Sequence, residues 1–212
     1  MPTPLIITSS LGILAFLLLF PALGTHPAVF WWQMAATNLI LTLSALLTDR
    51  HLRTSLAHDL NCLATSKLRW WGLLSAAILY LVFWLGHEGL LWLCPDVTDL
   101  QIGRVYQLKN ALPHWQIVLL ITAVIGPGEE IFWRGYLQRN LVRYYGTRRG
   151  ILLAVLLYSG VHITSANPLL ILAALICGAF WAALYQWKNS LCITIISHVT
   201  WDLLVFLILP LR

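Results

Sequence analysis

Charged side chains are scarce in this chain. Asp, Glu, Lys and Arg make up 10% of the 212 residues, whereas 59% of the residues are hydrophobic and the mean hydropathy is +0.79. A soluble domain carries about 25% charged residues, so this composition indicates an integral membrane protein. The net charge of +5 does not indicate a nucleic-acid partner, because the basic residues lie between apolar segments and form no single stripe.

Several sequence features that mark other classes of protein are also absent. The segment Met1-Pro2-Thr3-Pro4 has no basic residue, which argues against a cleaved signal peptide. We find no internal repeat, no low-complexity segment and no CxxC spacing. The cysteines are scattered, so we interpret them as structural thiols. They are Cys62, Cys94, Cys177 and Cys192.

Long apolar segments fill most of the sequence. A membrane-spanning helix needs roughly 20 mostly apolar residues, and the chain has room for about seven. We therefore predict an all-α, polytopic transmembrane helix bundle that forms a single integral membrane domain over residues 1–212. Residues 1–69 would hold the N-terminal spans and a cytoplasmic loop, in which 49–69 could lie on the membrane surface. The predicted spans are 5–23, 28–47, 70–93, 115–139, 150–163, 168–187 and 190–209, the fifth being short for a full crossing.

The basic residues predict an orientation. With the N-terminus in the cytoplasm, the inner segments hold nine Lys and Arg residues and the outer segments hold three, which follows the positive-inside rule. We therefore expect an integral protein of the bacterial inner membrane with a cytoplasmic N-terminus, in contact with membrane lipids. The nine inner residues are Arg50, Arg53, Lys67, Arg69, Arg139, Arg143, Arg148, Arg149 and Lys188.

Ionisable residues nevertheless occur inside three predicted spans. Each costs about 2.5–3.5 kcal/mol on insertion scales, so such residues usually line a polar cavity or are paired. At about 1.5 Å per residue, Glu129, His162 and His198 lie roughly 15, 18 and 12 Å from the inner ends of their spans. This shared depth predicts a polar catalytic cavity between the fourth, fifth and seventh spans, and residues 115–209 would form the catalytic core. The six residues are Glu129, Glu130, Arg134, His162, His198 and Asp202.

Helical spacing separates these residues by face. Residues four apart share a face of a helix, so Glu130 and Arg134 can form an ion pair while Glu129 points elsewhere. His198 and Asp202 also share a face. The preceding segment Gly126-Pro127-Gly128 is expected to break or kink the fourth helix and to open it to water.

Glutamate and histidine together can activate water. The carboxylate takes the proton, one imidazole positions the water, and a second imidazole stabilises the oxyanion. We find no Ser or Cys nucleophile with a nearby base, and we interpret Ser159 and Ser197 as packing residues. His87 and Glu88, near the outer end of the third span, are interpreted as interfacial.

The three motifs resemble those of the CPBP family. They are Glu-Glu-x-x-x-Arg from Glu129, an aromatic-x-x-x-His from Tyr158, and His-x-x-x-Asp from His198. That family comprises type II CAAX prenyl endopeptidases and bacterial bacteriocin-processing or immunity proteins. The resemblance implies an intramembrane protease of the glutamic type, with a cavity open to the cytosolic leaflet. Its substrate would be a peptide or protein with a hydrophobic or lipid-associated segment, such as a C-terminal tail or a leader peptide.

By position, the resemblance also implies residue roles. Glu129 with His162 would activate water, and His198 with Asp202 would form the oxyanion site. Glu130 and Arg134 would support the scaffold. Two residues depart from the usual pattern: Tyr158, where Phe is more common, and Asp202, where Asn is common and could donate a hydrogen bond that an ionised Asp cannot.

Three alternatives stay open at this point. Glu, His and Asp side chains have the right chemistry for Zn²⁺, although we expect no cofactor. The same cavity could serve a non-catalytic binder of hydrophobic peptides, such as an immunity or maturation protein. A small proton-coupled carrier would also use buried Glu and His, but the repeated broken helices of many transporters are missing.

Overall fold

The computed structural model describes residues 3–23, 26–60 and 66–211, and side chains for nearly all of these. Helices account for almost all of this part, and no strand occurs in it. The α-helices are α1 (Thr3–Leu19), α2 (Pro27–Thr48), α3 (Arg50–Leu60), α4 (Ser66–Leu93), α5 (Pro95–Tyr106), α6 (His114–Leu120), α7 (Gly126–Glu129), α8 (Arg139–Tyr145), α9 (Thr147–Gly160), α10 (Pro168–Lys188) and α11 (Leu191–Leu203).

Short 3₁₀ and π segments extend these helices. The 3₁₀ segments are η1 (Phe20–Leu23), η3 (Gln107–Asn110) and η6 (Val161–Ser165), and the π segments are η4 (Ile121–Ile125), η5 (Glu130–Gln138) and η7 (Leu204–Ile208).

Five helices are long and apolar enough to cross a membrane. They correspond to the second, third, fourth, sixth and seventh predicted spans, and the all-helical membrane class is confirmed. The helices at the first and fifth positions, α1 with 17 residues and α9 with 14, are shorter. Their crossing of the membrane, and so the total of seven, stays a prediction. The five are Pro27–Thr48, Ser66–Leu93, His114–Tyr145, Pro168–Lys188 and Leu191–Ile208.

The fourth predicted span is helical throughout, so Gly126-Pro127-Gly128 does not break it, and a kink at this point stays a prediction. The wider π turn of η4 precedes Pro127, and the Gly126 N–H donates to the Ile121 carbonyl five residues back. A π turn shifts the hydrogen-bond register, so the helix continues past a residue that has no N–H. The glycines instead admit neighbours: a Cβ on Gly126 would lie 2.6 Å from Val199 of α11, and one on Gly128 would lie 2.8 Å from Asn38 of α2.

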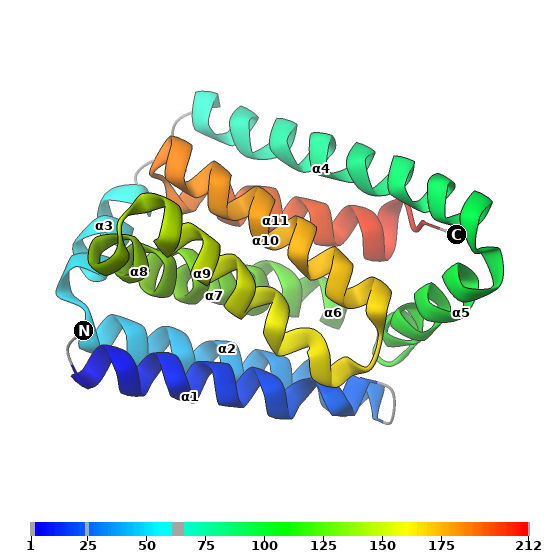
Figure 1. Cartoon of the computed structure of the whole chain (residues 1–212), viewed down its shortest axis with the longest axis horizontal. Helices are drawn as coiled ribbons and strands as arrows, with labels where there is room; N and C mark the ends of the chain where they lie inside the picture. The colour runs from blue at the N-terminus through cyan, green and yellow to red at the C-terminus, as the bar shows by residue number, and fades with distance from the viewer. Residues whose placement is uncertain (1–2, 24–25, 61–65, 212) are drawn as a thin grey trace.

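This continuous helix, His114–Tyr145, is the centre of the bundle. All nine residues of η5 are buried, although two of them are charged. Helices α1 and α2 cover one side, α9 and α10 pack beside it, and α4 lies along α11 on the far side (Figure 1). Large hydrophobic side chains remain exposed on the outer faces, among them Leu18 (71%), Leu47 (79%) and Trp92 (83%), as expected for surfaces that face lipid.

The two ends of the bundle differ. Helices α3 and α8 lie at one end, and α5 lies at the other (Figure 1). The predicted surface segment 49–69 is helical in α3, its residues 61–65 lie outside the described part, and 66–69 belong to α4. Asp59 of α3 accepts a hydrogen bond from the backbone N–H of Leu191 at 3.0 Å, which ties α3 to the start of α11. No helix was predicted in the connection that contains α5.

Candidate functional site

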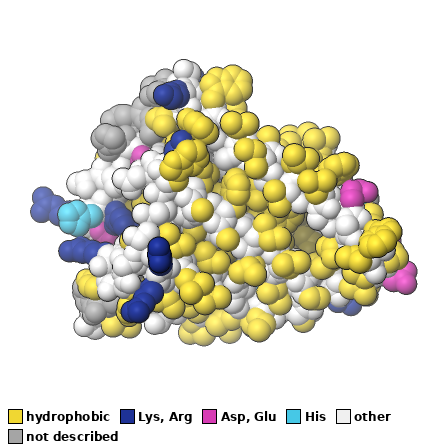
Figure 2. Space-filling model, turned by 45° about the horizontal axis from the view of Figure 1, so that its top comes forward, with side chains coloured by type: hydrophobic (Ala, Val, Ile, Leu, Met, Phe, Trp, Pro, Cys, Tyr) yellow, Lys and Arg dark blue, Asp and Glu magenta, His cyan; other side chains and the backbone are white. Residues whose placement is uncertain are grey.

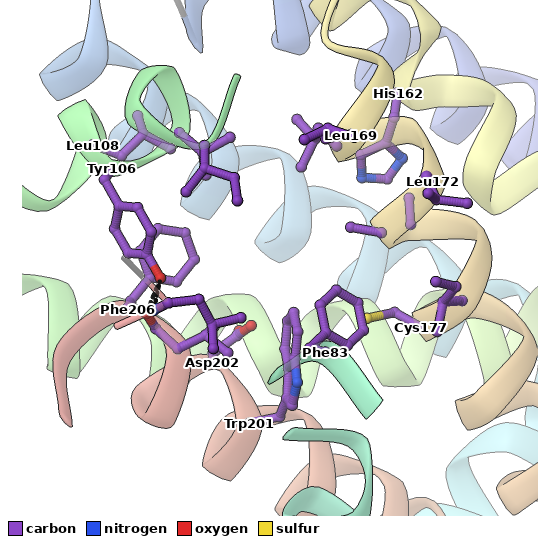
Figure 3. Close-up of a pocket in the computed structure, with 18 of the residues that line it drawn as sticks. Phe83, Tyr106, Leu108, His162, Leu169, Leu172, Cys177, Trp201, Asp202 and Phe206 are labelled. Atoms are coloured by element: carbon purple, nitrogen blue, oxygen red, sulfur yellow. Dashed lines mark hydrogen bonds between the residues drawn. The ribbon is translucent and has the colours of Figure 1, made fainter. Parts of the chain in front are cut away.

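Five of the seven residues predicted for the site line one cavity of about 370 Å³. They come from three segments: the end of α7, the end of α9 with η6, and the middle of α11. The remaining wall is almost entirely apolar and aromatic, and Figure 3 shows His162 and Asp202 facing the same open space from different helices. The five are Glu129, Tyr158, His162, His198 and Asp202.

Glu129 reaches this cavity with little exposure. It is 5% exposed, and its Oε2 accepts a hydrogen bond of 3.1 Å from the hydroxyl of Tyr158. The tyrosine that replaces the more common phenylalanine therefore gives Glu129 a partner on another helix. The sequence could suggest that Glu129 has no partner within its own helix, but the partner on α9 depends on tertiary packing.

His162 is held in one tautomer. Its Nδ1 lies 2.8 Å from the backbone carbonyl oxygen of Tyr158. A carbonyl oxygen can only accept, so Nδ1 carries the proton and a neutral ring keeps its lone pair on Nε2. The Phe20 ring packs against the imidazole with centroids 4.2 Å apart. Tyr158 thus positions both Glu129 and His162, one through its hydroxyl and the other through its backbone.

Glu130 and Arg134 form the ion pair that helical spacing predicts. Arg134 Nη1 lies 3.0 Å from Glu130 Oε1, and the two residues are 2% and 0% exposed. Glu130 Oε1 also lies 2.7 Å from His198 Nδ1. Glu130 therefore joins the central helix to α11 and orients His198, in addition to neutralising Arg134.

His198 lies between two carboxylates and an aromatic plane. Its Nδ1 contacts Glu130, whereas its Nε2 lies 3.6 Å from Asp202 Oδ2, beyond hydrogen-bond distance. The indole of Trp181 stacks on the imidazole with centroids 3.7 Å apart and planes at 19°. Trp181 also donates to Ser197 Oγ at 3.2 Å. This packing fixes the plane of the His198 ring and turns Nε2 toward Asp202.

Sequence reasoning missed several cavity residues. Trp181 and Phe20 belong to apolar runs, where nothing distinguishes a cavity wall from ordinary packing. Tyr106 comes from α5, in a connection between predicted spans to which no structure was assigned. His87 was interpreted as interfacial, but it is 5% exposed and lines the cavity, whereas its neighbour Glu88 has an exposed side chain. A helical reading of the connection, with its acidic first turn at Asp96, could have revealed α5.

The Glu, His and Asp side chains of the site are not arranged around a common point where a metal ion could bind. Within residues 3–23, 26–60 and 66–211, no three His, Cys, Asp or Glu side chains are grouped closely enough to hold an ion. Two of the potential ligands have other partners: Tyr158 for Glu129, and Glu130 for His198. The arrangement of these side chains does not fit the Zn²⁺ site that their residue types allow.

Comparison with known families agrees with these motifs. Residues 110–204 match the family model described as type II CAAX prenyl endopeptidase Rce1-like. This segment is therefore similar to the Rce1-like domain. The match confirms the resemblance to the CPBP family and contains all seven predicted site residues, from Glu129 to Asp202. It spans 95 of the 212 residues. Among curated proteins and solved structures, none matches this chain.

Proposed function

We propose that this chain is an intramembrane endopeptidase of the glutamic type, which hydrolyses a peptide bond near the membrane with water activated by Glu129 and His162. The observation that carries the proposal is the gathering of Glu129, His162, His198 and Asp202 around one apolar cavity in a segment similar to the Rce1-like domain. Buried ionisable groups without such a role are expensive in a membrane bundle.

The first half of the reaction belongs to Glu129 and His162. In its ionised form, the Glu129 carboxylate takes a proton from water while the hydroxyl adds to the peptide carbonyl carbon. His162 presents the lone pair of Nε2, because Nδ1 is committed to the Tyr158 carbonyl. That nitrogen can orient the water by accepting its second hydrogen. The proton held on Glu129 then passes to the leaving amine as the C–N bond breaks.

The second half belongs to His198. With Nδ1 bound to Glu130, the Nε2 position faces Asp202 and the cavity. When Nε2 carries a proton, it can donate to the oxyanion of the tetrahedral intermediate. Asp202 has no donor when ionised and lies 3.6 Å from Nε2, so in this proposal it acts on His198 through its charge, while Glu130 and Trp181 hold the ring in place. Glu130 and Arg134 keep the supporting role that the resemblance implies.

The cavity favours a hydrophobic substrate segment. Its wall consists mainly of Phe, Trp, Leu and Ile side chains from several helices, which suits an apolar stretch of peptide next to the scissile bond. We propose that α1 and α9 complete seven membrane-embedded helices, that the N-terminus is cytoplasmic, and that the protein lies in the bacterial inner membrane. We also propose that the reaction needs no metal or other cofactor.

The decisive experiment compares four purified variants in lipid or detergent. Glu129→Gln, His162→Ala and His198→Ala should each lower turnover by at least about 100-fold, the usual size of a general-base or oxyanion contribution, while remaining folded. Glu88→Gln is the matched control, because the Glu88 side chain is exposed and does not line the cavity. Retained turnover in Glu129→Gln would falsify the mechanism. If the protein is instead a non-catalytic peptide binder, the Glu129→Gln variant should still give the wild-type phenotype.

Two further measurements refine the proposal. Tyr158→Phe removes the 3.1 Å hydrogen bond to Glu129 but keeps the aromatic ring and the backbone carbonyl that holds His162. We expect a loss of about 10-fold, corresponding to one hydrogen bond to a charged group. Strong chelation should leave the rate of the wild-type enzyme unchanged, and loss of activity that added Zn²⁺ restores would contradict metal independence.

A further inference from the structure

The cavity occupies only one half of the bundle. Each wall helix contributes residues from its middle toward the end where α5 lies. Helix α4 gives Val82 to Leu90 out of Ser66–Leu93, and the central helix gives Ile121, Ile125 and Glu129 but nothing beyond. Helix α2 gives Phe30 to Met34 near its start, and α11 together with η7 gives His198 to Phe206. The site therefore opens away from α3 and α8.

The basic residues gather at the opposite end. Arg50 and Arg53 lie in α3, Arg139 and Arg143 in α8, and Lys188 at the end of α10. Figure 2 shows basic side chains toward one end and a recess among hydrophobic side chains in the other half. Under the positive-inside rule, the basic end faces the cytoplasm. The predicted orientation and the cytosolic opening implied by the family resemblance therefore cannot both hold.

Helix α5 and segment η3 lie across this end of the bundle. Tyr106 donates from its hydroxyl to the Val205 carbonyl at 2.7 Å and accepts from the Leu211 N–H at 2.8 Å. Trp31 donates to the Leu108 carbonyl at 2.9 Å, and Asn167 donates to the Gln101 carbonyl at 2.9 Å. These bonds fasten α5 and η3 to α2, α10 and α11, so the route into the cavity along the bundle axis is covered.

The side of the bundle offers another route. Val82 of α4 and Leu172 of α10 both line the cavity, yet they are 44% and 43% exposed. The cavity thus meets the apolar outer surface between these two helices. In Figure 3, the Phe83 ring of α4 lies next to Cys177 of α10, and Leu172 lies apart from them, nearer His162. An opening framed by apolar side chains on a lipid-facing surface admits a segment that is already within the bilayer.

We propose that the site is loaded sideways from the extracytoplasmic half of the membrane, between α4 and α10. Its substrates would be hydrophobic segments of exported or membrane-anchored proteins, cut on the extracytoplasmic side. Tails presented by cytosolic proteins would not reach it. This inference deepens the proposed function and rests on it for the identity of the reaction, but the side of access is a separate property of the bundle.

The first test determines which end of the bundle faces outward. In a full-length variant with all four cysteines replaced by serine, one exposed position at each end becomes cysteine: Asp99→Cys in α5 and Arg149→Cys in α9. A membrane-impermeant maleimide should label Asp99→Cys in intact cells and Arg149→Cys only after permeabilisation. The reverse pattern would overturn the proposal. Trp115→Cys, at a 66% exposed position near the α5 end, serves as a second probe if Asp99→Cys does not fold.

The second test locates the cleavage. Protein termini are compared between cells that express the wild-type enzyme and cells that express Glu129→Gln. New termini that depend on Glu129 should fall in or beside hydrophobic segments on the extracytoplasmic side. Termini on the cytoplasmic side would refute the inference while leaving the protease intact. If no terminus depends on Glu129, the proposed function fails, and the labelling result still reports the side of the cavity.

Discussion

Removing Arg134 should destabilise the protein more than any exposed charge would. Its guanidinium is 2% exposed, pairs with the fully buried Glu130 at 3.0 Å, and lies 4.5 Å from the ring centre of Tyr158 and 5.4 Å from that of Trp181. Arg134→Met keeps the apolar stem but leaves the Glu130 carboxylate buried without the guanidinium charge, although His198 Nδ1 remains 2.7 Å away. Breaking a buried pair in this way costs about 3–5 kcal/mol, a large share of the stability of a typical domain.

A double-mutant cycle separates this cost from lost packing. Glu130→Gln removes the charge while keeping a carbonyl oxygen that can accept from His198. We therefore expect the double variant to recover about 1–3 kcal/mol relative to the sum of the single losses. The cation–π contacts of Arg134, about 0.5–2 kcal/mol, should not be recovered. The free energy of unfolding can be measured by titration with a denaturing detergent in mixed micelles.

A partly exposed ion pair made by the same helix provides the matched control. Arg139→Met breaks the pair with Asp49 at 2.6 Å, in which both side chains are partly exposed, so it should cost only about 1 kcal/mol. If Arg134→Met also unfolds within about 1 kcal/mol of the wild type, the buried pair is not the scaffold element described above. Additive losses in the cycle would likewise show that Glu130 and Arg134 act independently.

Two other predictions concern the end where α8 and α9 meet. Burial raises the pKa of Asp49, but the hydrogen bonds from Leu52 and Asn140 and the charge of Arg139 outweigh it and lower the pKa below its ordinary value of 3.8. The stability difference between wild type and Asp49→Asn should therefore be constant above pH 3.8 and shrink as the pH falls through the lower, folded-state pKa. A difference that grows on acidification would contradict this. Gly150→Ala should destabilise the protein by at least about 1–3 kcal/mol, because its Cβ would clash with the Val142 backbone in α8. Gly160→Ala, whose Cβ would meet nothing within 4 Å outside its own helix, should be neutral or slightly stabilising in thermal unfolding.

Much of the architecture follows from the sequence because the membrane imposes simple rules. Spanning helices must be apolar and about 20 residues long, so composition alone predicts the helical class and the positions of the five long helices. The i, i+4 rule gave the contact between Glu130 and Arg134, since both partners lie on one helix. The ionisable residues inside apolar segments, from Glu129 to Asp202, all fall within the Rce1-like match at residues 110–204.

Only the tertiary structure decided how those residues are arranged. That Tyr158 donates to Glu129, and that Glu130 holds His198, depends on contacts between helices, which no local pattern encodes. The continuity of the central helix past Pro127 depends on a π turn whose register is set by close packing at Gly126 and Gly128. Which half of the bundle holds the cavity is also visible only in the structure, because the sequence indicates the ends of each helix but not the space between the helices.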